Sequence, residues 1–288
     1  MFFTPQIRTL VVLGRVANLP TVCSNCLAGW WLGGGGNYWK LPFLLLGVSL
    51  LYIGGAFLND AFDAESDHQR RPERPIPSGK ISLQLAWRLG FSHLAAGIFL
   101  LLFCSQFSAG TAIILALFIM LYNFSHKFFT AAPWLLGACR LWIYILAGAT
   151  GATGLNGWPI MGGAVMTLYI AGASFVVRRD HQHGAIPFRP LLLLAAPALL
   201  AMAMNAGSFR LRAIWIAAGF LIWAGWCVRK RFLDGTSNAA IITANLMAGI
   251  ILADWLAVAP QISFWTGFTV FLSLFGLTKW LQKFAPAN

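Results

Sequence analysis

Charged side chains are scarce in this sequence of 288 residues. Only 10% of the residues are charged and only eight are Asp or Glu, whereas a soluble globular domain carries about 25% charged residues. The hydrophobic fraction of 59% and the mean hydropathy of +0.73 exclude a disordered chain, because such chains have too little apolar surface to bury. The composition therefore excludes both an ordinary soluble enzyme and an unfolded segment.

Paired cysteines and strand-like alternation are also missing. The five cysteines fall within or beside apolar stretches, and an odd, scattered set is not a disulfide framework. Cys23 and Cys26 form a C-x-x-C motif without a second pair beside it.

A membrane barrel would show strands of alternating polarity, which this chain does not. The 20 Lys and Arg punctuate apolar runs and form no basic patch, so no nucleic-acid partner is expected.

Long uncharged runs are what the sequence does contain. No Asp, Glu, Lys or Arg lies in 89–126 or in 141–177, and each run exceeds the roughly 20 apolar residues that cross a bilayer core. Because lipid admits only helices and closed barrels, we predict an all-α transmembrane bundle of nine to ten helices around a central cavity, a single domain over 1–288. Turn and charge signals delimit ten apolar segments: 7–32, 41–64, 83–106, 109–125, 132–152, 158–177, 189–206, 209–228, 237–258 and 262–283.

The basic residues predict how this bundle is oriented. If the N-terminus is cytoplasmic, only Lys40, Arg210 and Arg212 fall in outer loops, while most other Lys and Arg fall in inner loops, as the positive-inside rule describes. We therefore predict an integral membrane protein, of a bacterial inner membrane, with the polar mouth of its cavity on the cytoplasmic side. Membrane lipids are then its immediate surroundings.

Most of the acidic residues gather at one predicted helix end. Those in the stretch 60–73 are Asp60, Asp63, Glu65, Asp67 and Glu73. At about 100° per residue, Asp60, Asp63 and Asp67 share one helical face and Glu65 does not. Carboxylate oxygens on one face suit Mg²⁺, which keeps some water and also binds substrate phosphates. The alternative is a solvated helix end paired with the arginines of 70–74, which does not explain this spacing.

The residues from Asn59 to Ser82 resemble the first motif of the UbiA superfamily of intramembrane prenyltransferases. Residues 59–67 read N-D-A-F-D-A-E-S-D and residues 71–79 read R-P-E-R-P-I-P-S-G, similar to the family pattern N-D-x-x-D-x-x-x-D followed by R-P-x-R-P-I-P-S-G. The match looks most like the branch of chlorophyll synthases and archaeal-type glycerol-phosphate prenyltransferases. It implies that three residues hold Mg²⁺ and carry catalysis, Asp60, Asp63 and Asp67, and that three others bind substrate, Asn59, Arg71 and Arg74.

Weaker resemblances add further candidate substrate-binding residues. The stretch 122–127, Y-N-F-S-H-K, is similar to the family's Y-[ST]-x-x-[LF]-K and implies a role for Lys127, and Arg140 is similar to the arginine of a helix-five pattern. The family's second acidic motif, D-x-x-x-D, is expected near 174–184. That stretch holds one acid, Asp180, preceded by Arg178 and Arg179.

This departure from the family leaves two readings of the arginines. Arg178 and Arg179 can bind diphosphate directly, as bidentate donors, so that one metal and an arginine clamp replace two metals. Alternatively they are only the orienting charges of an inner loop.

Three polar residues lie outside these motifs. Arg15 and Asn18 share one face of the first predicted helix and are expected to face the bundle interior. Asp254 lies within an apolar segment, where an ionisable side chain is costly unless it is paired or faces a cavity. We expect a buried packing or functional role for it.

The resemblance implies a membrane transferase that moves a polyprenyl group from a prenyl diphosphate to a small-molecule acceptor. Mg²⁺ would stabilise the departing diphosphate, and aromatic faces would shield an allylic cation. The degenerate second motif favours one alternative, a non-catalytic relative that binds lipid or scaffolds a partner. A transporter would carry its ionisable residues near the middle of the membrane, whereas these acids cluster at one end.

Overall fold

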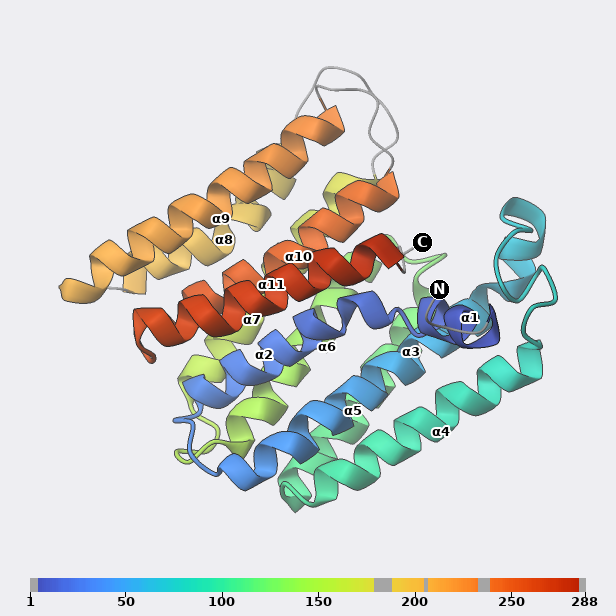
Figure 1. Ribbon diagram of the computed structural model, residues 1–288, viewed down its shortest axis with the longest axis horizontal. Coiled ribbons are helices and arrows are strands. Elements are labelled where there is room, and N and C mark those ends of the chain that lie inside the picture. The colour runs from blue at the N-terminus through green and yellow to red at the C-terminus, as the bar shows by residue number, and fades with distance from the viewer. Residues whose placement is uncertain (1–4, 179–187, 205–206, 233–238, 285–288) are drawn as a thin grey trace.

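The structure, a computed structural model, describes residues 5–178, 188–204, 207–232 and 239–284. These residues form helices and no strands (Figure 1). In chain order the elements are α1 (Pro5–Leu13), the 3₁₀ turn η1 (Val16–Asn18), α2 (Leu19–Leu32), the 3₁₀ turn η2 (Tyr38–Lys40), α3 (Leu41–Arg70), α4 (Leu83–Leu102), α5 (Gln106–Ser125), α6 (Ala132–Thr150), α7 (Gly157–Arg178), α8 (Phe188–Met204), α9 (Ser208–Phe232), α10 (Ala239–Val258) and α11 (Phe264–Phe284).

The all-α transmembrane prediction is confirmed. Seven helices of the described residues are long and apolar enough to cross a membrane, or up to eight if the bent pair α1 and α2 is one span. From 41–64 onward, every predicted apolar segment corresponds to one helix. The chain is an integral membrane protein.

The first predicted segment, 7–32, is not one continuous helix. The chain breaks between α1 and α2, which are bent by 49° relative to each other. Arg15 at the break has φ 48° and ψ 40°, a left-handed conformation that is uncommon for a residue with a side chain. Pro20 lies in the first turn of α2, where its missing N–H is tolerated. A new helix therefore starts after the break.

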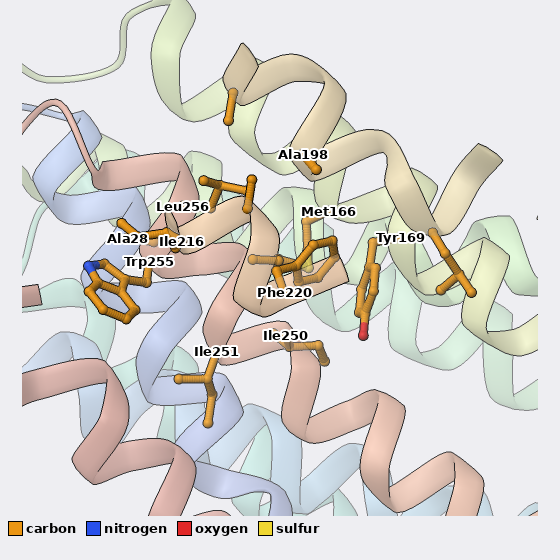
Figure 2. Close-up of a cluster of buried hydrophobic side chains, with 14 of the residues drawn as sticks. Ala28, Met166, Tyr169, Ala198, Ile216, Phe220, Ile250, Ile251, Trp255 and Leu256 are labelled. Carbon is orange, nitrogen blue, oxygen red and sulfur yellow. The ribbon is translucent and has the colours of Figure 1, made fainter. Parts of the chain in front are cut away.

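Helix α2 is the centre of the bundle. It packs against α3, α6, α7, α10 and α11, and in Figure 1 it runs between α11 and α3. Apolar cores lie on both sides of it. One core gathers side chains of α7 to α10, among them Met166, Tyr169, Phe220 and Ile250 (Figure 2). The other fills the space between α3, α4 and α5. This arrangement places residues of α2 close to most of the bundle.

Helix α3 carries the acidic motif and is longer than one membrane crossing. It has 30 residues, whereas about 20 suffice for a bilayer core. The acids lie in its last turns, at the end of the bundle where α1 packs on α3 (Figure 1). The excess length therefore presents the motif at one end of the bundle.

Glycines let α3 approach α4 closely. A Cβ placed on Gly54 of α3 would lie 2.8 Å from the Gly90 carbonyl oxygen of α4. A Cβ on Gly97 of α4 would lie 2.7 Å from the Gly47 carbonyl oxygen of α3. Small residues at such positions let backbones meet, which matters in a membrane because helix association gains little from the hydrophobic effect.

We expect Gly54→Leu to push α3 away from α4 and to destabilise the protein. Overpacking at a tight backbone contact costs about 1–3 kcal/mol, so detergent-solubilised protein should unfold at a lower temperature. The matched control is Gly219→Leu in α9, where an added Cβ meets nothing within 4 Å. Equal unfolding temperatures for the two variants would contradict the close α3–α4 contact.

Candidate functional site

The three aspartates on one face of α3 each pair with a cation from another part of the chain. Asp60, Asp63 and Asp67 follow one another at one-turn intervals. Their partners come from the break between α1 and α2, from the end of α5, and from the loop after α3. The sequence motif is thus assembled with segments that lie far from it in the chain.

Asp60 pairs with Arg15 across the helix break. The Arg15 Nη2 lies 3.3 Å from Asp60 Oδ1 and also donates to Asn59 Oδ1. The Asn59 amide in turn donates to Asn123 Oδ1 of α5 at 3.2 Å. A strained backbone such as that of Arg15 persists where its surroundings hold it. The contacts of the Arg15 side chain with Asn59 and Asp60 stabilise its left-handed backbone.

Asp63 pairs with Lys127 and contacts His126 at the end of α5. Its Oδ1 lies 2.9 Å from Lys127 Nζ and 3.2 Å from His126 Nε2. Lys127 also donates to the Phe62 carbonyl oxygen at 3.0 Å. The end of α5 is therefore attached to α3, as the resemblance of 122–127 implies for Lys127.

Asp67 pairs with Arg74 of the loop that follows α3. The Arg74 Nη1 lies 2.7 Å from Asp67 Oδ2 and 3.9 Å from Asp60 Oδ1. One guanidinium thus compensates two carboxylates and folds the loop back on the helix. Arg71, three residues earlier, is exposed and forms no ion pair among the described residues.

A cavity of about 1930 Å³ opens beside this site. Its lining includes seven basic residues and one acidic residue, Glu73, among the residues the structure describes: Arg8, Arg15, Arg71, Arg74, Lys80, Arg140 and Lys283. The aspartates of α3 do not line it, so Arg15 and Arg74 lie on the cavity side of the acids. Apolar groups of α7, α10 and α11 form much of the remaining wall. The cavity therefore suits a ligand with an anionic head and an apolar body.

The expected three-carboxylate metal site is not assembled in the described part of the chain. No group of three His, Cys, Asp or Glu side chains lies close enough together there to hold a metal ion. Carboxylates on one face repel one another unless cations intervene, and side-chain cations intervene here. The carboxylate oxygens of these aspartates are still suitable ligands for Mg²⁺. One or two carboxylates with substrate phosphates usually bind this ion, without an all-protein cage.

The other predicted residues divide into those near the site and those outside the described residues. Asn59 and Arg74 contact the aspartates or their partners, and Arg140 is buried at the cavity wall. Arg179 and Asp180 lie outside the described residues, and so does the side chain of Arg178. Their proposed diphosphate contacts stay a prediction.

Two residues of the site were not among the predicted site residues. The sequence places Arg15 toward the bundle interior but gives no sign of its left-handed conformation, although Gly14 and Pro20 beside it are helix-breaking signals. His126 stands next to Lys127 in the stretch 122–127, and the family pattern implies no role for it.

The comparison with known families and proteins gives a consistent result. The model described as UbiA prenyltransferase family matches residues 19–239. A digeranylgeranylglyceryl phosphate synthase of Methanoregula boonei is 27% identical over 76% of this chain and 80% of its own length. The synthase of the same name from Sulfolobus acidocaldarius is 30% identical over 42% of this chain and 44% of its own.

Solved structures resemble the chain over most of its length. A structure described for digeranylgeranylglyceryl phosphate synthase in membranes has a TM-score of 0.59 at 22% identity. The apo structure of a UbiA homolog from Aeropyrum pernix K1 has a TM-score of 0.65 at 15% identity. Each comparison covers 90% of this chain and 100% of the other. At these identities the likeness concerns the fold.

We expect a double-mutant cycle of Arg74→Gln and Asp67→Asn to show a coupling free energy of about 1 kcal/mol or more, because the two groups share a short ion pair. The measurement is unfolding of the purified protein in detergent. Arg71→Gln combined with Asp67→Asn is the control cycle, since Arg71 does not pair with this acid. A coupling no larger than that of the control would contradict the Arg74 bridge.

Proposed function

Because the chain belongs to the UbiA prenyltransferase family and is a membrane prenyltransferase, we propose that it holds the diphosphate of its donor at the end of the cavity beside Asp60 and Asp63. The observation that carries this proposal is the order of the charged side chains, with the arginines next to the cavity and the carboxylates farther from it. The arginines line the cavity, and the carboxylates they pair with lie behind them. An entering diphosphate meets the arginines first.

The arginines have the chemistry for this role. A guanidinium binds phosphate oxygens through paired N–H donors, and such charge-assisted hydrogen bonds are the strong ones. Arg15 and Arg74 line the cavity close to the acids, and Arg71 and Lys80 line it nearby without ion pairs among the described residues. The prenyl tail would lie along the apolar part of the wall, between α7, α10 and α11.

Mg²⁺ is proposed as the cofactor, held by Asp60 and Asp63, with Asp67 as a third candidate ligand. When bound, the ion would neutralise developing charge on the diphosphate oxygens. The cationic partners approach Asp60 and Asp63 at Oδ1 and Asp67 at Oδ2. Each carboxylate can thus offer an oxygen while its other oxygen keeps its side-chain partner.

The proposed reaction is a substitution at the first carbon of the prenyl chain. The bond between that carbon and the diphosphate oxygen breaks, and its electron pair leaves with the diphosphate. A lone pair of the acceptor forms the new bond, and the proton that the acceptor loses ends on the released diphosphate. Arg15 and Arg74 stabilise the negative charge that grows on the leaving group.

The site residues also support two further proposals, that the chain is one domain and that its N-terminus faces the cytoplasm. Residues of α1, α3, α5, α6, α7, α10 and α11 line one cavity, so we propose that 1–288 acts as one prenyltransferase domain. The basic loops favour a cytoplasmic N-terminus. Because α1 lines the same cavity, its mouth would open to the cytoplasm, in a bacterial inner membrane.

We expect Asp60→Asn and Asp63→Asn each to lower kcat/KM by at least 100-fold, about 3 kcal/mol of lost transition-state stabilisation. The assay incubates the purified protein in lipid with labelled geranylgeranyl diphosphate and a panel of acceptors, with Mg²⁺ or EDTA, and reads the products by mass spectrometry. Activity should disappear with EDTA and return with Mg²⁺.

Glu65→Gln is the matched control for these variants. It lies on the same helix, is exposed, and points away from the three aspartates. Its turnover should stay within about twofold of the unaltered protein. Full turnover in either aspartate variant would remove Asp60 or Asp63 from catalysis.

A further inference from the structure

A second group of basic side chains lies at the ends of α9 and α11, apart from the aspartates of α3. The last turn of α9 carries Arg229, Lys230 and Arg231, and α11 carries Lys279 and Lys283 near its end. The start of α10, which follows the end of α9 along the chain, lines the large cavity together with the end of α11 and the loop after α3. These helix ends therefore lie at the same end of the bundle as the acidic motif (Figure 1).

Two of these lysines lie over a pair of tryptophans. Lys230 Nζ is 4.3 Å from the centre of the Trp226 ring, and Lys279 Nζ is 5.8 Å from the centre of the Trp223 ring. The centres of the two indole rings are 5.2 Å apart. Both ammonium groups also lie within electrostatic range of the Cys227 side chain. The four lysine and tryptophan side chains thus form one group, called here the Lys–Trp cluster.

Neutral side chains hold Lys279 in this cluster. Its ammonium donates to Asn245 Oδ1 of α10 at 2.5 Å and to Gln282 Oε1 at 3.0 Å. The Gln282 amide in turn donates to the Ala244 carbonyl oxygen, and Trp223 Nε1 donates to the Asn245 carbonyl oxygen, both at 2.9 Å. An ammonium has three N–H donors. Among the described residues, two of them have acceptors, so one donor of Lys279 and its positive charge remain for a ligand.

Carboxylates are scarce in this part of the chain. After residue 180 the sequence has eight Lys and Arg but only two acids, Asp234 and Asp254, and Asp234 lies outside the described residues. Lys279 forms no ion pair in the ranges that the structure describes. Lys283, one turn further along α11, is close enough to repel it. The ends of α9 and α11 thus carry excess positive charge.

Asp254 has its partners elsewhere in the bundle. Its side chain is fully buried. It accepts hydrogen bonds from Ser24 and Asn25 of α2 and from Tyr144 of α6. This fulfils the expectation that an ionisable side chain within an apolar segment is paired. Because donors from α2 and α6 occupy this carboxylate, an anion from outside the chain is needed to compensate the lysines.

An exposed apolar face of α9 leads up to the cluster. Ile222, Trp226 and Arg229 follow one another at intervals of three to four residues, so they share one helical face. Ile222 is 73% exposed and Trp226 is 39% exposed, and Arg229 is also exposed. In a membrane, indoles favour the headgroup level, and apolar side chains deeper in the bilayer contact acyl chains. This face therefore changes from apolar to cationic along the helix, as a phospholipid changes from its tails to its headgroup.

We propose that the Lys–Trp cluster binds the headgroup of an anionic phospholipid of the surrounding membrane. The headgroup phosphate accepts hydrogen bonds from Lys230 and Lys279, and an acyl chain lies along the exposed face of α9 beside Ile222. Basic groups between transmembrane helices are suited to anionic headgroups. Lysines that served only to orient the chain would need their charge alone, without the neutral acceptors that hold Lys279 beside Trp223. The site does not depend on the proposed reaction.

A bound headgroup would connect two helices that meet through a third. Helices α9 and α11 each pack against α10 (Figure 1), and the cluster takes one lysine from α9 and one from α11. A lipid that binds both lysines therefore ties the ends of these helices together. Since a ligand that binds only the folded state stabilises it, the anionic lipid should also raise the unfolding temperature of the protein.

The first test measures binding of phosphatidylglycerol and of zwitterionic phosphatidylcholine to the purified full chain in a neutral detergent, by native mass spectrometry. The unaltered protein should bind phosphatidylglycerol at least tenfold more tightly. Each lysine is expected to contribute about fivefold, so the double variant Lys230→Gln, Lys279→Gln should bring the two affinities within about twofold. Equal affinities for the two lipids in the unaltered protein would overturn the proposal. If the double variant fails to fold, each single variant should lower the preference about fivefold.

The matched control is Lys40→Gln. Lys40 Nζ lies 5.5 Å from the centre of the Trp39 ring, in the turn η2 before α3. It is thus a lysine over an indole at the other end of α3, without a second lysine of this kind beside it among the described residues. The lipid preference of this variant should equal that of the unaltered protein. A loss equal to that of the double variant would show that net charge, and not the cluster, determines binding.

The second test separates the built site from its charge. Asn245→Leu keeps both lysines but removes the Oδ1 atom that holds Lys279, and Gln282→Leu removes its other acceptor. Each variant should lower the preference for phosphatidylglycerol severalfold, and the unfolding temperature should then rise less on addition of this lipid. An unchanged preference in both variants would return the lysines to an orienting role and overturn the site.

Two further measurements exclude other sources of the same phosphate chemistry. Inorganic phosphate, added in place of lipid, should leave the unfolding temperature unchanged, and a rise equal to that with phosphatidylglycerol would assign the cluster to a soluble anion. The large cavity is also basic, so Arg71→Gln combined with Lys80→Gln is compared. This variant should keep the full lipid preference. Loss of the preference here, with retention in the Lys230→Gln, Lys279→Gln variant, would place the lipid in the cavity and overturn the proposal.

Discussion

Charge compensation on α3 is the constraint on which this end of the molecule depends. Three aspartates on one helical face repel one another, and the structure places a cation beside each of them. Those cations belong to the break between α1 and α2, to the end of α5, and to the loop after α3. Compensating the acids therefore also fixes three segments that apolar packing alone leaves unspecified, because apolar side chains gain little from one another in lipid.

The sequence predicts the elements whose signals are local. Uncharged runs gave the helices, the i, i+3, i+7 spacing gave the acidic face, and the family motif gave Arg74. The partners of Asp254 could not be found in the same way, because Ser24, Asn25 and Tyr144 belong to helices far away in the chain. The left-handed Arg15 was missed for a related reason. Tertiary contacts stabilise such a conformation, and the nearby Gly14 and Pro20 are signals of a break but not of the conformation of Arg15.

The order of charges in the cavity bears on the altered second motif. The lining among the described residues is predominantly basic, and the three aspartates sit behind Arg15 and Arg74. A site with this order presents direct guanidinium contacts to a diphosphate before it presents carboxylates. Under the proposed function, loss of one carboxylate from the second motif therefore removes metal ligands but not the main positive charge. Arginine serves this purpose better than lysine because its planar fork matches phosphate oxygens.

The short segment from Arg15 to Asn18 connects the break after α1 to the acidic face of α3. Arg15 reaches Asp60 on one side, and Asn18 presents its free oxygen to the cavity on the other. Only a 3₁₀ turn separates them, and the Asn18 N–H bonds the Arg15 carbonyl within it. Because reacting groups must be held close to their productive geometry, a tight turn at the start of the central helix is a better spacer than a long loop. The left-handed backbone of Arg15 then has a purpose, since a continuous helix would direct its guanidinium differently and separate it from Asn59 and Asp60.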